Sequence, residues 1–561
     1  MVGLATVFGA GGGTSSYAEI ETANVIIMWG SNAREAHPIF FHHVLKAVNA
    51  GARLFTVDPR RTTTAAFGTH LQLHVGTDIA LAYAIGREII VNELDNGAFI
   101  KSATTGFKEY RDAAMEWTLE RASAETGVDA ALIADLARAY AGAGTAQLCW
   151  TLGITEHHNA VDNVVSLINL ALLTGHVGRE GSGLSPLRGQ NNVQGGGDMG
   201  AIPNRFTGFQ DILDPDIRAK FERAYGRDIL PEYGWHLTQM FEAMERGDLR
   251  AAYVIGENPA QSEADVAHTR HLLEGLDHLV VQDLFLTKTA ELADVVLPAA
   301  AAWCESAGTV TNSERRVQRV RKAVNGPGEA RDDMWIILEM ARLMGASWNY
   351  GGWPLDRSAD VEVVAESVWE ELRTLSPMHQ GMSYARIADE GGLQWPCESD
   401  TELGPTFLHG RLWAADLADR GRLAPFSVVT HELPVDECTP EFPIRLTTGR
   451  RLDSYNTGVQ SGAFSSPLRF GETIDLHPND AAALEVVPGD MARVISRRGA
   501  VEAPVRLDDG LRPGLAFMTF HFPEQVDVNL ITIEAADPRS GTSEFKATAV
   551  RIEKVSELVN V

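Results

Sequence analysis

The chain has 561 residues, of which 45% are hydrophobic and 22% are charged, as is usual for a globular protein. Acidic residues outnumber Lys and Arg by 75 to 48, and the net charge of −27 argues against nucleic acid or an anionic membrane as a partner, because both bind basic patches. At roughly 150 residues per domain, the length predicts about three or four domains, with cores that need no disulfide or metal staple.

The first predicted unit is a strand, a helix and a second strand. The strands are apolar and rich in β-branched residues, as in buried parallel sheets, and the helix begins at a proline and ends before a glycine. These elements are expected at residues 24–29, 38–50 and 53–57, with a further strand at 71–75. Because open α/β sheets bind ligands at the carboxyl ends of their strands, the loops that follow the first two strands are candidate binding loops.

A related unit is predicted downstream, with strands at 251–255, 278–282 and 294–297. Any two doubly wound domains share some loop glycines and aspartates, but the near-constant spacing here favours an internal duplication. Two equivalent crevices imply two similar nucleotide-like ligands, or one ligand built from two halves. The recurring residues, at offsets of 225 or 226, are Gly30 with Gly256, Asn32 with Asn258, Asp58 with Asp283 and Thr62 with Thr287.

The rest of the chain changes character twice. Helices are expected at 129–143 and 163–174, with a strand at 146–150 that leads into a loop at 152–155, and the stretch 331–390 is predicted to be mixed helix and loop. From about residue 425, short strands and turns predict a C-terminal β-barrel. Its strands are expected at 444–447, 491–495, 501–505 and 515–519, with hairpin turns at 498–499 and 508–510.

The most unusual segment is 184–200, which has five glycines and four carboxamide side chains around Arg188. One interpretation is a polar surface loop, since Gly and Asn cluster in turns. The other is a pocket in which backbone N–H groups approach a ligand and Arg188 offers a planar fork to a carboxylate.

Histidines and cysteines do not form a metal site in this sequence. His42 and His43 are adjacent and face different ways on a helix, whereas His157 and His158 follow the loop at 152–156 and are candidates for lining a pocket. Cys149, Cys304, Cys397 and Cys438 include no Cys-x-x-Cys pair, so we expect reduced thiols and a cytoplasmic location. No apolar run approaches the 18 or so residues of a membrane span, and residues 1–16 lack the basic start of a signal peptide.

Segments along nearly the whole chain resemble the catalytic subunit of molybdenum- or tungsten-dependent formate dehydrogenases, within the molybdopterin oxidoreductase family. The most specific is Leu187–Gly195, with the sequence Leu-Arg-Gly-Gln-Asn-Asn-Val-Gln-Gly. The others are Ser16–Glu21, Gly30–Asn32, Ala36–Pro38, Asp58–Arg61, Gly76–Asp78, Leu172–His176, Gly256–Pro259, Gln282–Ala290, Ala293–Pro298 and Glu544–Lys546.

This resemblance implies an α/β fold with two related doubly wound dinucleotide-binding domains at 1–190 and 191–380, a connecting segment at 381–424, and a barrel of the double-psi type at 425–561. The cofactor would be bis-molybdopterin guanine dinucleotide with Mo or W, one dinucleotide on each α/β domain, with the barrel closing over both. By position, the first dinucleotide would contact Gly30, Asn32, Asp58, Arg60, Gly76 and Asp78, and the second Gly256, Asn258, Ser262, Gln282, Asp283 and Lys288. Leu152, Gly153 and Glu156 would lie between the pterins, Gln190 on the pterin beside Arg188, and Arg450, Asn456, Asn529, Phe545 and Lys546 would be the barrel contacts.

The reaction implied by the resemblance is the two-electron oxidation of formate to CO2. Arg188 would anchor the formate carboxylate while hydride passes to the metal centre. The electrons would leave through an electron-transfer protein or subunit, of the iron–sulfur, NAD-reducing or hydrogenase type.

The sequence also departs from the family pattern. The family carries a [4Fe-4S] site and a metal-ligating Cys or selenocysteine in a segment that would precede Val2, so we expect little activity from the 561 residues alone. Our hypothesis is that an in-frame UGA selenocysteine codon was taken as a stop, and the nucleotides upstream of Met1 test it. Smaller departures are Glu156, where Gln is common, and Gly197, where Cys is common. In Asp332–Met334 the acidic residue expected just before Trp335 is shifted, which puts that guanine contact in doubt.

The sequence favours three other functions less. A nitrate-type molybdopterin oxidoreductase is disfavoured by the Arg188 segment. A cofactor-free structural subunit, like the large iron–sulfur subunit of respiratory complex I, is disfavoured by the paired Gly, Asn and Asp loops. A nicotinamide dehydrogenase is the weakest option, since Gly30-Ser-Asn is not a GxGxxG motif.

Overall fold

A computed structural model of the chain describes residues 1–302, 304–353, 359–452, 454–457 and 471–555. The chain forms two compact units, each described here by itself. Unit 1 comprises Met1–Leu187, Pro259–His271 and Phe407–Val561, and unit 2 comprises Arg188–Asn258 and Leu272–Thr406. The division of the chain at residues 190, 380 and 424 stays a prediction.

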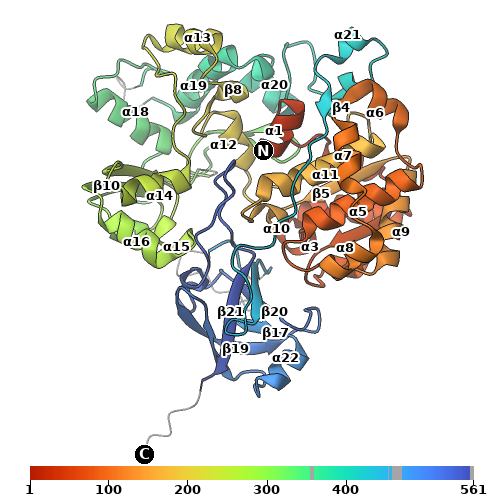
Figure 1. Cartoon of the computed structure of the whole chain (residues 1–561). Helices are drawn as coiled ribbons and strands as arrows, with labels where there is room; N and C mark the ends of the chain where they lie inside the picture. Colours follow the sequence, from red (N-terminus) through yellow and green to blue (C-terminus); the bar gives the residue numbers. More distant parts are fainter. Residues whose placement is uncertain (303, 354–358, 453, 458–470, 556–561) are drawn as a thin grey trace, which may run out of the picture. The chain divides into compact units, whose positions relative to one another are not determined.

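Unit 1 is built on a five-stranded parallel sheet with the order β3-β2-β1-β5-β6; Figure 1 labels its strand β5 and several of the helices around it. The strands are β1 (Val25–Trp29), β2 (Arg53–Val57), β3 (Thr69–Leu71), β5 (Ala146–Trp150) and β6 (Gly183–Pro186). Four of the five, β1, β2, β5 and β6, are buried over nearly their whole length, which is why β1 is a continuous apolar run and β2 and β5 are mostly apolar rather than alternating.

Helices cover both faces of this sheet. Alternate residues of β1 enter different cores: Ile27 and Trp29 pack among the helices α5, α9 and α11, whereas Ile26 and Met28 pack with α4. These helices are α4 (Pro38–Asn49), α5 (Asp78–Val91), α9 (Ala130–Gly142) and α11 (Ala160–Thr174). The first domain is therefore doubly wound, as predicted.

Shorter elements complete the α/β part of unit 1. They are α1 (Val2–Phe8), α2 (Tyr17–Ile20), α3 (Ala33–Ala36), α6 (Gly97–Ala103), β4 (Thr104–Thr105), α7 (Phe107–Ala114), α8 (Leu119–Thr126), α10 (Leu152–Thr155), α15 (Pro259–Ser262), α21 (Leu417–Arg420) and β15 (Ala424–Pro425).

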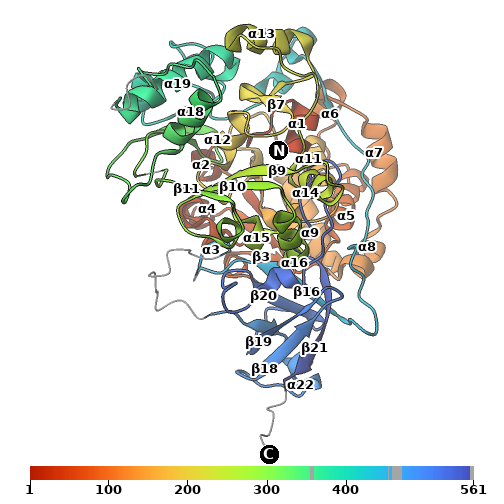
Figure 2. The same ribbon diagram turned by 90° about the vertical axis from the view of Figure 1, so that its left-hand side faces the viewer.

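The C-terminal part of unit 1 is a closed six-stranded barrel with the order β16-β20-β17-β19-β18-β21 (Figure 2). Its strands are β16 (Ile444–Gly449), β17 (Ile474–Leu476), β18 (Met491–Ile495), β19 (Ala500–Leu507), β20 (Leu515–Thr519) and β21 (Thr548–Lys554), with the helix α22 (Pro478–Ala483). Inward residues such as Leu446, Val494 and Ala516 fill the barrel as one apolar core. The predicted barrel is confirmed.

Unit 2 contains the second parallel sheet, with the order β11-β10-β9, and a small antiparallel sheet β12-β13-β14. The strands are β9 (Ala251–Ile255), β10 (His278–Asp283), β11 (Val295–Pro298), β12 (Gly308–Thr311), β13 (Arg316–Val320), β14 (Leu393–Gln394) and the pair β7 (Arg205–Phe206) and β8 (Gln210–Asp211). The helices are α12 (Val193–Asp198), α13 (Pro215–Tyr225), α14 (Leu237–Glu245), α17 (Lys288–Glu291), α18 (Asp333–Leu343), α19 (Val361–Leu375) and α20 (Tyr384–Asp389), while α16 (Val266–Glu274) crosses from unit 1 into unit 2.

The two parallel sheets repeat one local geometry. Both glycines after the first strand adopt left-handed φ angles, 56° at Gly30 and 62° at Gly256. Each donates its N–H to a carbonyl at or next to the end of the neighbouring strand, at 2.7 Å from Gly30 to Val57 and 2.8 Å from Gly256 to Gln282. The asparagines two residues later also match, since Asn32 Oδ1 accepts from the Thr64 hydroxyl at 2.9 Å and Asn258 Oδ1 from the Thr289 hydroxyl at 2.7 Å. The repeated spacing in the sequence thus corresponds to a repeated hydrogen-bonded loop.

Three local predictions were wrong. The third strand of the first sheet is Thr69–Leu71 and not 71–75, and the loop at 152–155 is the short helix α10. The turn at 508–510 does not close a hairpin, because β17 lies between β19 and β20 and pairs with both. The other predicted turn, Arg498–Gly499, does join an antiparallel pair, β18 and β19.

No helix among the described residues is both long enough and apolar enough to cross a membrane.

Candidate functional site

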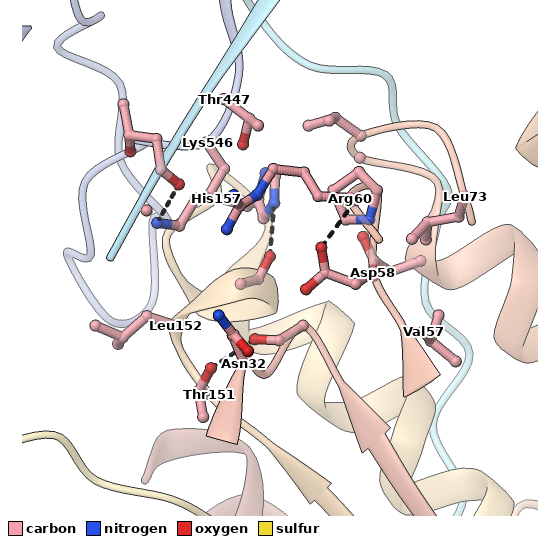
Figure 3. Close-up of a pocket in the computed structure, with 18 of the residues that line it drawn as sticks. Asn32, Val57, Asp58, Arg60, Leu73, Thr151, Leu152, His157, Thr447 and Lys546 are labelled. Carbon is pink, nitrogen blue, oxygen red and sulfur yellow. Dashed lines mark hydrogen bonds between the residues drawn. The ribbon is translucent and has the colours of Figure 1, made fainter. Parts of the chain in front are cut away.

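A pocket in unit 1 opens where the carboxyl ends of β1, β2 and β5 face the first barrel strand, β16 (Figure 3). Its empty volume is about 740 Å³, part of it open to solvent. The described lining residues come from six separate stretches of chain and are Gly30, Asn32, Ala36, Val57, Asp58, Pro59, Arg60, Leu73, Val75, Gly76, Asp78, Thr151, Leu152, Gly153, His157, Thr447, Thr448, Gly449, Arg450 and Lys546. Ten of the predicted binding residues therefore line one pocket: Gly30, Asn32, Asp58, Arg60, Gly76, Asp78, Leu152, Gly153, Arg450 and Lys546.

The floor of the pocket requires glycine at two touching positions. A Cβ added to Gly30 would lie 2.9 Å from the carbonyl carbon of Gly153, and one added to Gly153 would lie 2.4 Å from the carbonyl oxygen of Gly30. The same carbonyl accepts hydrogen bonds from the Gly153 N–H at 3.2 Å and from the Thr151 hydroxyl at 2.5 Å. The loops after β1 and β5 are held together by their backbones, which leaves room for a ligand above them.

Asp58 and Arg60 form the next layer at the end of β2. The Arg60 N–H donates to Asp58 Oδ1 at 2.9 Å, and the Arg60 guanidinium carbon lies 3.5 Å from the centre of the Phe517 ring. Burial raises the pKa of Asp58, although the charge of Arg60 opposes that shift. Figure 3 shows both side chains directed into the pocket from the same strand end.

Lys546 enters the pocket from the barrel and pairs with Glu156, which lies next to the pocket. The Lys546 ammonium is 2.7 Å from Glu156 Oε2 and donates to the Thr448 carbonyl at 3.0 Å, and Arg450 Nη2 lies 3.7 Å from Glu156 Oε1. Burial alone raises the pKa of Glu156, but Lys546 and Arg450 outweigh it and hold that pKa below its usual value. Burial likewise lowers the pKa of Lys546 against the opposing charge of Glu156.

A second buried group of charges, His157, His158 and Glu544, lies beside the pocket. His157 Nδ1 lies 3.1 Å from Glu544 Oε1, and His158 Nδ1 lies 3.2 Å from Glu544 Oε2, with the Glu544 side chain fully buried. Burial raises the pKa of Glu544, but the two histidines outweigh this and lower it to about 2. Asp78, whose pKa is raised by burial, accepts from Trp29 Nε1 at 2.7 Å.

The pocket has a local charge unlike that of the whole chain. Besides His157, its described lining residues include three cations, Arg60, Arg450 and Lys546, against two carboxylates, Asp58 and Asp78. Anionic groups such as phosphates are therefore favoured here, even in a chain with a net charge of −27.

The second set of predicted residues lies around the end of β10 in unit 2. Gln282 donates through Nε2 to Asp333 Oδ1 at 2.5 Å, and the Tyr253 hydroxyl donates to Gln282 Oε1. Asp283 follows directly, and burial raises the pKa of its carboxyl. Asn258 Nδ2 is buried with no hydrogen-bond partner among the described residues. Asp333, left in doubt by the sequence, is thus placed beside Gln282.

Ser262 and Asn529 meet inside unit 1. Asn529 Nδ2 donates to the Ser262 carbonyl at 3.0 Å, while Asn529 Oδ1 is buried and has no partner within the described chain. Ser31 Oγ, in the loop after β1, is also buried without a hydrogen-bond partner among the described residues. Since a buried polar atom without a partner costs about 1–3 kcal/mol, a ligand that bonds these atoms would recover that free energy.

The remaining predicted residues lie in varied positions. Phe545 donates its N–H to the Glu156 carbonyl at 3.2 Å, and Asn456 Oδ1 accepts from Arg450 Nε at 3.1 Å. Gln190 is exposed. Arg188 is partly buried in unit 2, where its Nε donates to Gln194 Oε1 at 3.0 Å. The segment 184–200 is therefore no simple surface loop, because Gln194 and Asp198 within it are fully buried.

Sequence reasoning missed part of the pocket wall. Thr151, Thr447, Thr448 and Gly449 carry no motif, and only their place at strand ends could have suggested them. His157 was a candidate without a partner, since Glu544 lies far away in the sequence. In the part of the chain that the structure describes, no cluster of three His, Cys, Asp or Glu residues forms a metal site.

A sheet with a glycine loop and acidic strand ends, closed by a barrel that contributes cations, defines a nucleotide-binding α/β protein. Comparison with known proteins makes this specific. The family model "Molybdopterin oxidoreductase" matches residues 6–343, and the model of a molybdopterin dinucleotide-binding domain matches residues 444–549. The chain therefore belongs to the molybdopterin oxidoreductase family.

Similar proteins include alpha subunits of formate dehydrogenases. The chain is 39% identical to the F420-dependent formate dehydrogenase subunit alpha of Methanocaldococcus jannaschii, over 99% of this chain and 80% of that protein. It is 34% identical to formate dehydrogenase H of Escherichia coli, over 99% of this chain and 76% of that protein. It is also 32% identical to the assimilatory nitrate reductase catalytic subunit of Bacillus subtilis, over 97% of this chain and 76% of that protein.

Among solved structures, acetylene hydratase from Pelobacter acetylenicus aligns with a TM-score of 0.72 at 19% identity, over 99% of this chain and 80% of that one. At this identity the likeness concerns the fold alone. The predicted fold class is confirmed, and the matched domains indicate a molybdopterin dinucleotide cofactor. The glycine floor, the three pocket cations and the unpartnered buried atoms of the loops fit such a ligand.

Proposed function

We propose that this oxidoreductase is the catalytic subunit of a formate dehydrogenase, which oxidises formate to CO2, a proton and two electrons. The observation that carries the proposal is Arg188 within the Leu187–Gly195 segment, together with the formate dehydrogenase alpha subunits among the relatives. Guanidinium and carboxylate form charge-assisted, bidentate hydrogen bonds. Each such bond contributes about 1.5–3 kcal/mol, which is enough to orient a small anion.

The cofactor of this proposal is bis-molybdopterin guanine dinucleotide carrying Mo or W, which supplies the two-electron acceptor when bound. In unit 1, Gly30 and Gly153 would form the floor, Arg60 and Lys546 would face the anionic groups, and Asp58 would accept from donor groups of the ligand. The repeated loop of unit 2 would hold the second dinucleotide with its own set of side chains, namely Gly256, Asn258, Gln282, Asp283 and Lys288. Each α/β domain, at 1–190 and 191–380, would thus hold one half of the cofactor.

The chain's own residues have limited tasks in this reaction. Arg188 binds the carboxylate and orients the C–H bond of formate, and the buried pairs around Glu156 and Glu544 keep the pocket walls in place. The hard chemistry belongs to the cofactor, and the protein supplies binding, orientation and electrostatics. Electrons would leave through an iron–sulfur, NAD-reducing or hydrogenase partner, and the cytoplasmic location expected from the scattered thiols is part of the same proposal.

The test compares formate-dependent dye reduction with nitrate-dependent oxidation of a reduced dye, using holoenzyme with its metal measured by mass spectrometry. We expect formate activity from holoenzyme produced from the full-length gene, and Arg188→Ala in that protein should lose most of it while keeping the metal. Arg218→Ala, which removes a surface cation paired with Glu222 in the same unit, is the matched control and should keep full activity.

Each other outcome overturns the proposal in a defined way. Unchanged formate turnover in Arg188→Ala would remove the role of Arg188. Activity with nitrate alone would place the enzyme with its nitrate reductase relative, which is 32% identical. Absence of both Mo and W from the purified protein would favour a cofactor-free structural subunit.

A further inference from the structure

We infer that Gln194 and Asp198 are positioning residues that fix the orientation of the Arg188 guanidinium. The inference deepens the proposed function and rests on it for the role of Arg188. The three side chains form one hydrogen-bonded chain, in which Arg188 Nε donates to Gln194 Oε1 at 3.0 Å and Gln194 Nε2 donates to Asp198 Oδ1 at 2.7 Å.

The local structure brings these residues together. Gln194 and Asp198 lie four positions apart on α12 (Val193–Asp198), so both side chains are on the same face of one helical turn. The segment just before α12 is tied down as well, because the Arg188 N–H donates to Ser313 Oγ at 2.8 Å. Arg188 is thus held at its backbone by one contact and at its Nε by another.

The Gln194 amide is the polar link that gives this chain a direction. Its oxygen must face Arg188, which is a donor, and its nitrogen must face the carboxylate of Asp198, which accepts. A rotation of the amide by half a turn would set donor against donor at Arg188 and acceptor against acceptor at Asp198. An ionised Asp198 therefore selects the amide orientation that holds Arg188.

Asp198 is anchored on its far side. Its Oδ2 accepts from Trp395 Nε1 at 2.7 Å. Trp395 is itself held by the fully buried Arg315, which donates to the Trp395 carbonyl and whose guanidinium carbon lies 5.6 Å from the Trp395 ring centre. Asp198 and Gln194 are both completely buried. Groups in such a place keep one geometry, because water cannot replace a lost hydrogen bond.

The network also has a pH dependence. Burial raises the pKa of Asp198 to about 7, against the hydrogen bonds of Gln194 and Trp395 and the charges of Arg188 and Arg315, the two cations that act on it. Below this pH Asp198 becomes neutral, and its protonated oxygen is a poor acceptor. We therefore expect the hold on Arg188, and the affinity for formate, to weaken as the pH falls through about 7.

The experiment uses two substitutions in the holoenzyme. In Asp198→Asn a single acceptor oxygen replaces the two that accept from Gln194 and Trp395, so the orientation of the Gln194 amide is no longer fixed. Gln194→Met removes the hydrogen-bonding amide between Arg188 and Asp198 while nearly keeping the side-chain volume. For both we expect the KM for formate to rise about 10-fold or more with a smaller change in kcat, because a lost hydrogen bond to a charged group is worth about that factor. Formate binding measured by calorimetry should weaken in parallel.

Two controls separate positioning from simple structural support. Gln210→Met removes an amide of the same unit that donates to the Thr207 and Leu375 carbonyls and does not touch Arg188, so KM should stay unchanged. In the native enzyme KM should rise as the pH falls through about 7, and Asp198→Asn should remove this dependence. Trp395→Phe removes one donor to the carboxylate and should shift the midpoint to higher pH.

The inference is overturned if Gln194→Met and Asp198→Asn bind formate as tightly as the native enzyme, or if the KM midpoint persists in Asp198→Asn. Should Asp198→Asn fail to fold, Gln194→Met and Trp395→Phe decide by the same two measurements. A normal KM in these variants beside a strong loss in Arg188→Ala refutes the positioning network alone, whereas full activity in Arg188→Ala refutes the proposed function itself.

Discussion

The buried pair of His157 and Glu544 predicts a stability that depends on pH in a defined window. The substitution Glu544→Gln removes the negative charge and nearly keeps the shape of the side chain. The pKa of Glu544 falls from 4.5 to about 2 in the folded protein, because the two histidines outweigh burial. At about 1.4 kcal/mol per pKa unit, this shift contributes about 3 kcal/mol to the free energy of unfolding once the carboxyl is ionised in both states.

The sign of the pH dependence follows from both partners. The lowered pKa of Glu544 stabilises the fold above pH 4.5, and this contribution is lost as the pH falls toward about 2. For His157, burial lowers the pKa, but the charge of Glu544 has the larger opposite effect, so the pKa of His157 lies above 6.5. Stability from His157 is complete below pH 6.5 and is lost as the pH rises through the raised pKa. The pair thus stabilises most between pH 4.5 and 6.5.

The assay is chemical unfolding of native protein and Glu544→Gln, followed by tryptophan fluorescence at pH 5.5 and at pH 9. We expect a loss of about 3 kcal/mol at the lower pH and a clearly smaller loss at the higher one. Glu553→Gln is the control, because Glu553 is an exposed barrel residue paired with Arg551, and it should change stability by less than about 0.5 kcal/mol. An equal loss at both pH values, or a loss no larger than that of the control, would refute the reasoning.

Two further predictions concern the floor and the wall of the pocket. Gly30→Ala should destabilise cofactor-free protein by about 1–3 kcal/mol more than Gly256→Ala in thermal unfolding, since both positions have a positive φ but only Gly30 would press a Cβ against Gly153; equal shifts would contradict this. Lys546→Met should cost about 3–5 kcal/mol in chemical unfolding, because it leaves the Glu156 carboxylate buried beside Arg450 alone, and adding Glu156→Gln should restore part of the loss. A double variant no better than Lys546→Met would show that the charge of Glu156 is not the cause.

Most of the α/β framework could be predicted from local sequence signals. The strand β1 is a continuous apolar run and β2 and β5 are mostly apolar, because strands covered on both faces need no polar side. The strands β9 and β10 were also predicted from their apolar residues, although β9 is partly exposed in the structure. The glycine and asparagine loops after β1 and β9 were predictable for a different reason, since few residue types adopt the left-handed conformation of Gly30 and Gly256. In the barrel the short strand β17 and the longer strand β21 were not predicted. The insertion of β17 between β19 and β20 replaces the expected hairpin by a different connection.

What the sequence by itself determined is the fold class, the repeated binding loop and the identity of ten of the residues that line the pocket of unit 1. The fold class and the loop follow from hydrophobic pattern, backbone conformation and spacing, which act over a few tens of residues, whereas the pocket residues follow from the resemblance to the molybdopterin oxidoreductase family. Only the tertiary structure decided the partners: Glu156 with Lys546, His157 with Glu544, and Arg188 with a buried chain through Gln194 to Asp198. The first two pairs join residues almost 400 positions apart, and the last is decided by burial that a polar, glycine-rich sequence does not indicate. Charges and amides acquire their function from the neighbours that exclude water around them, and the fold chooses those neighbours.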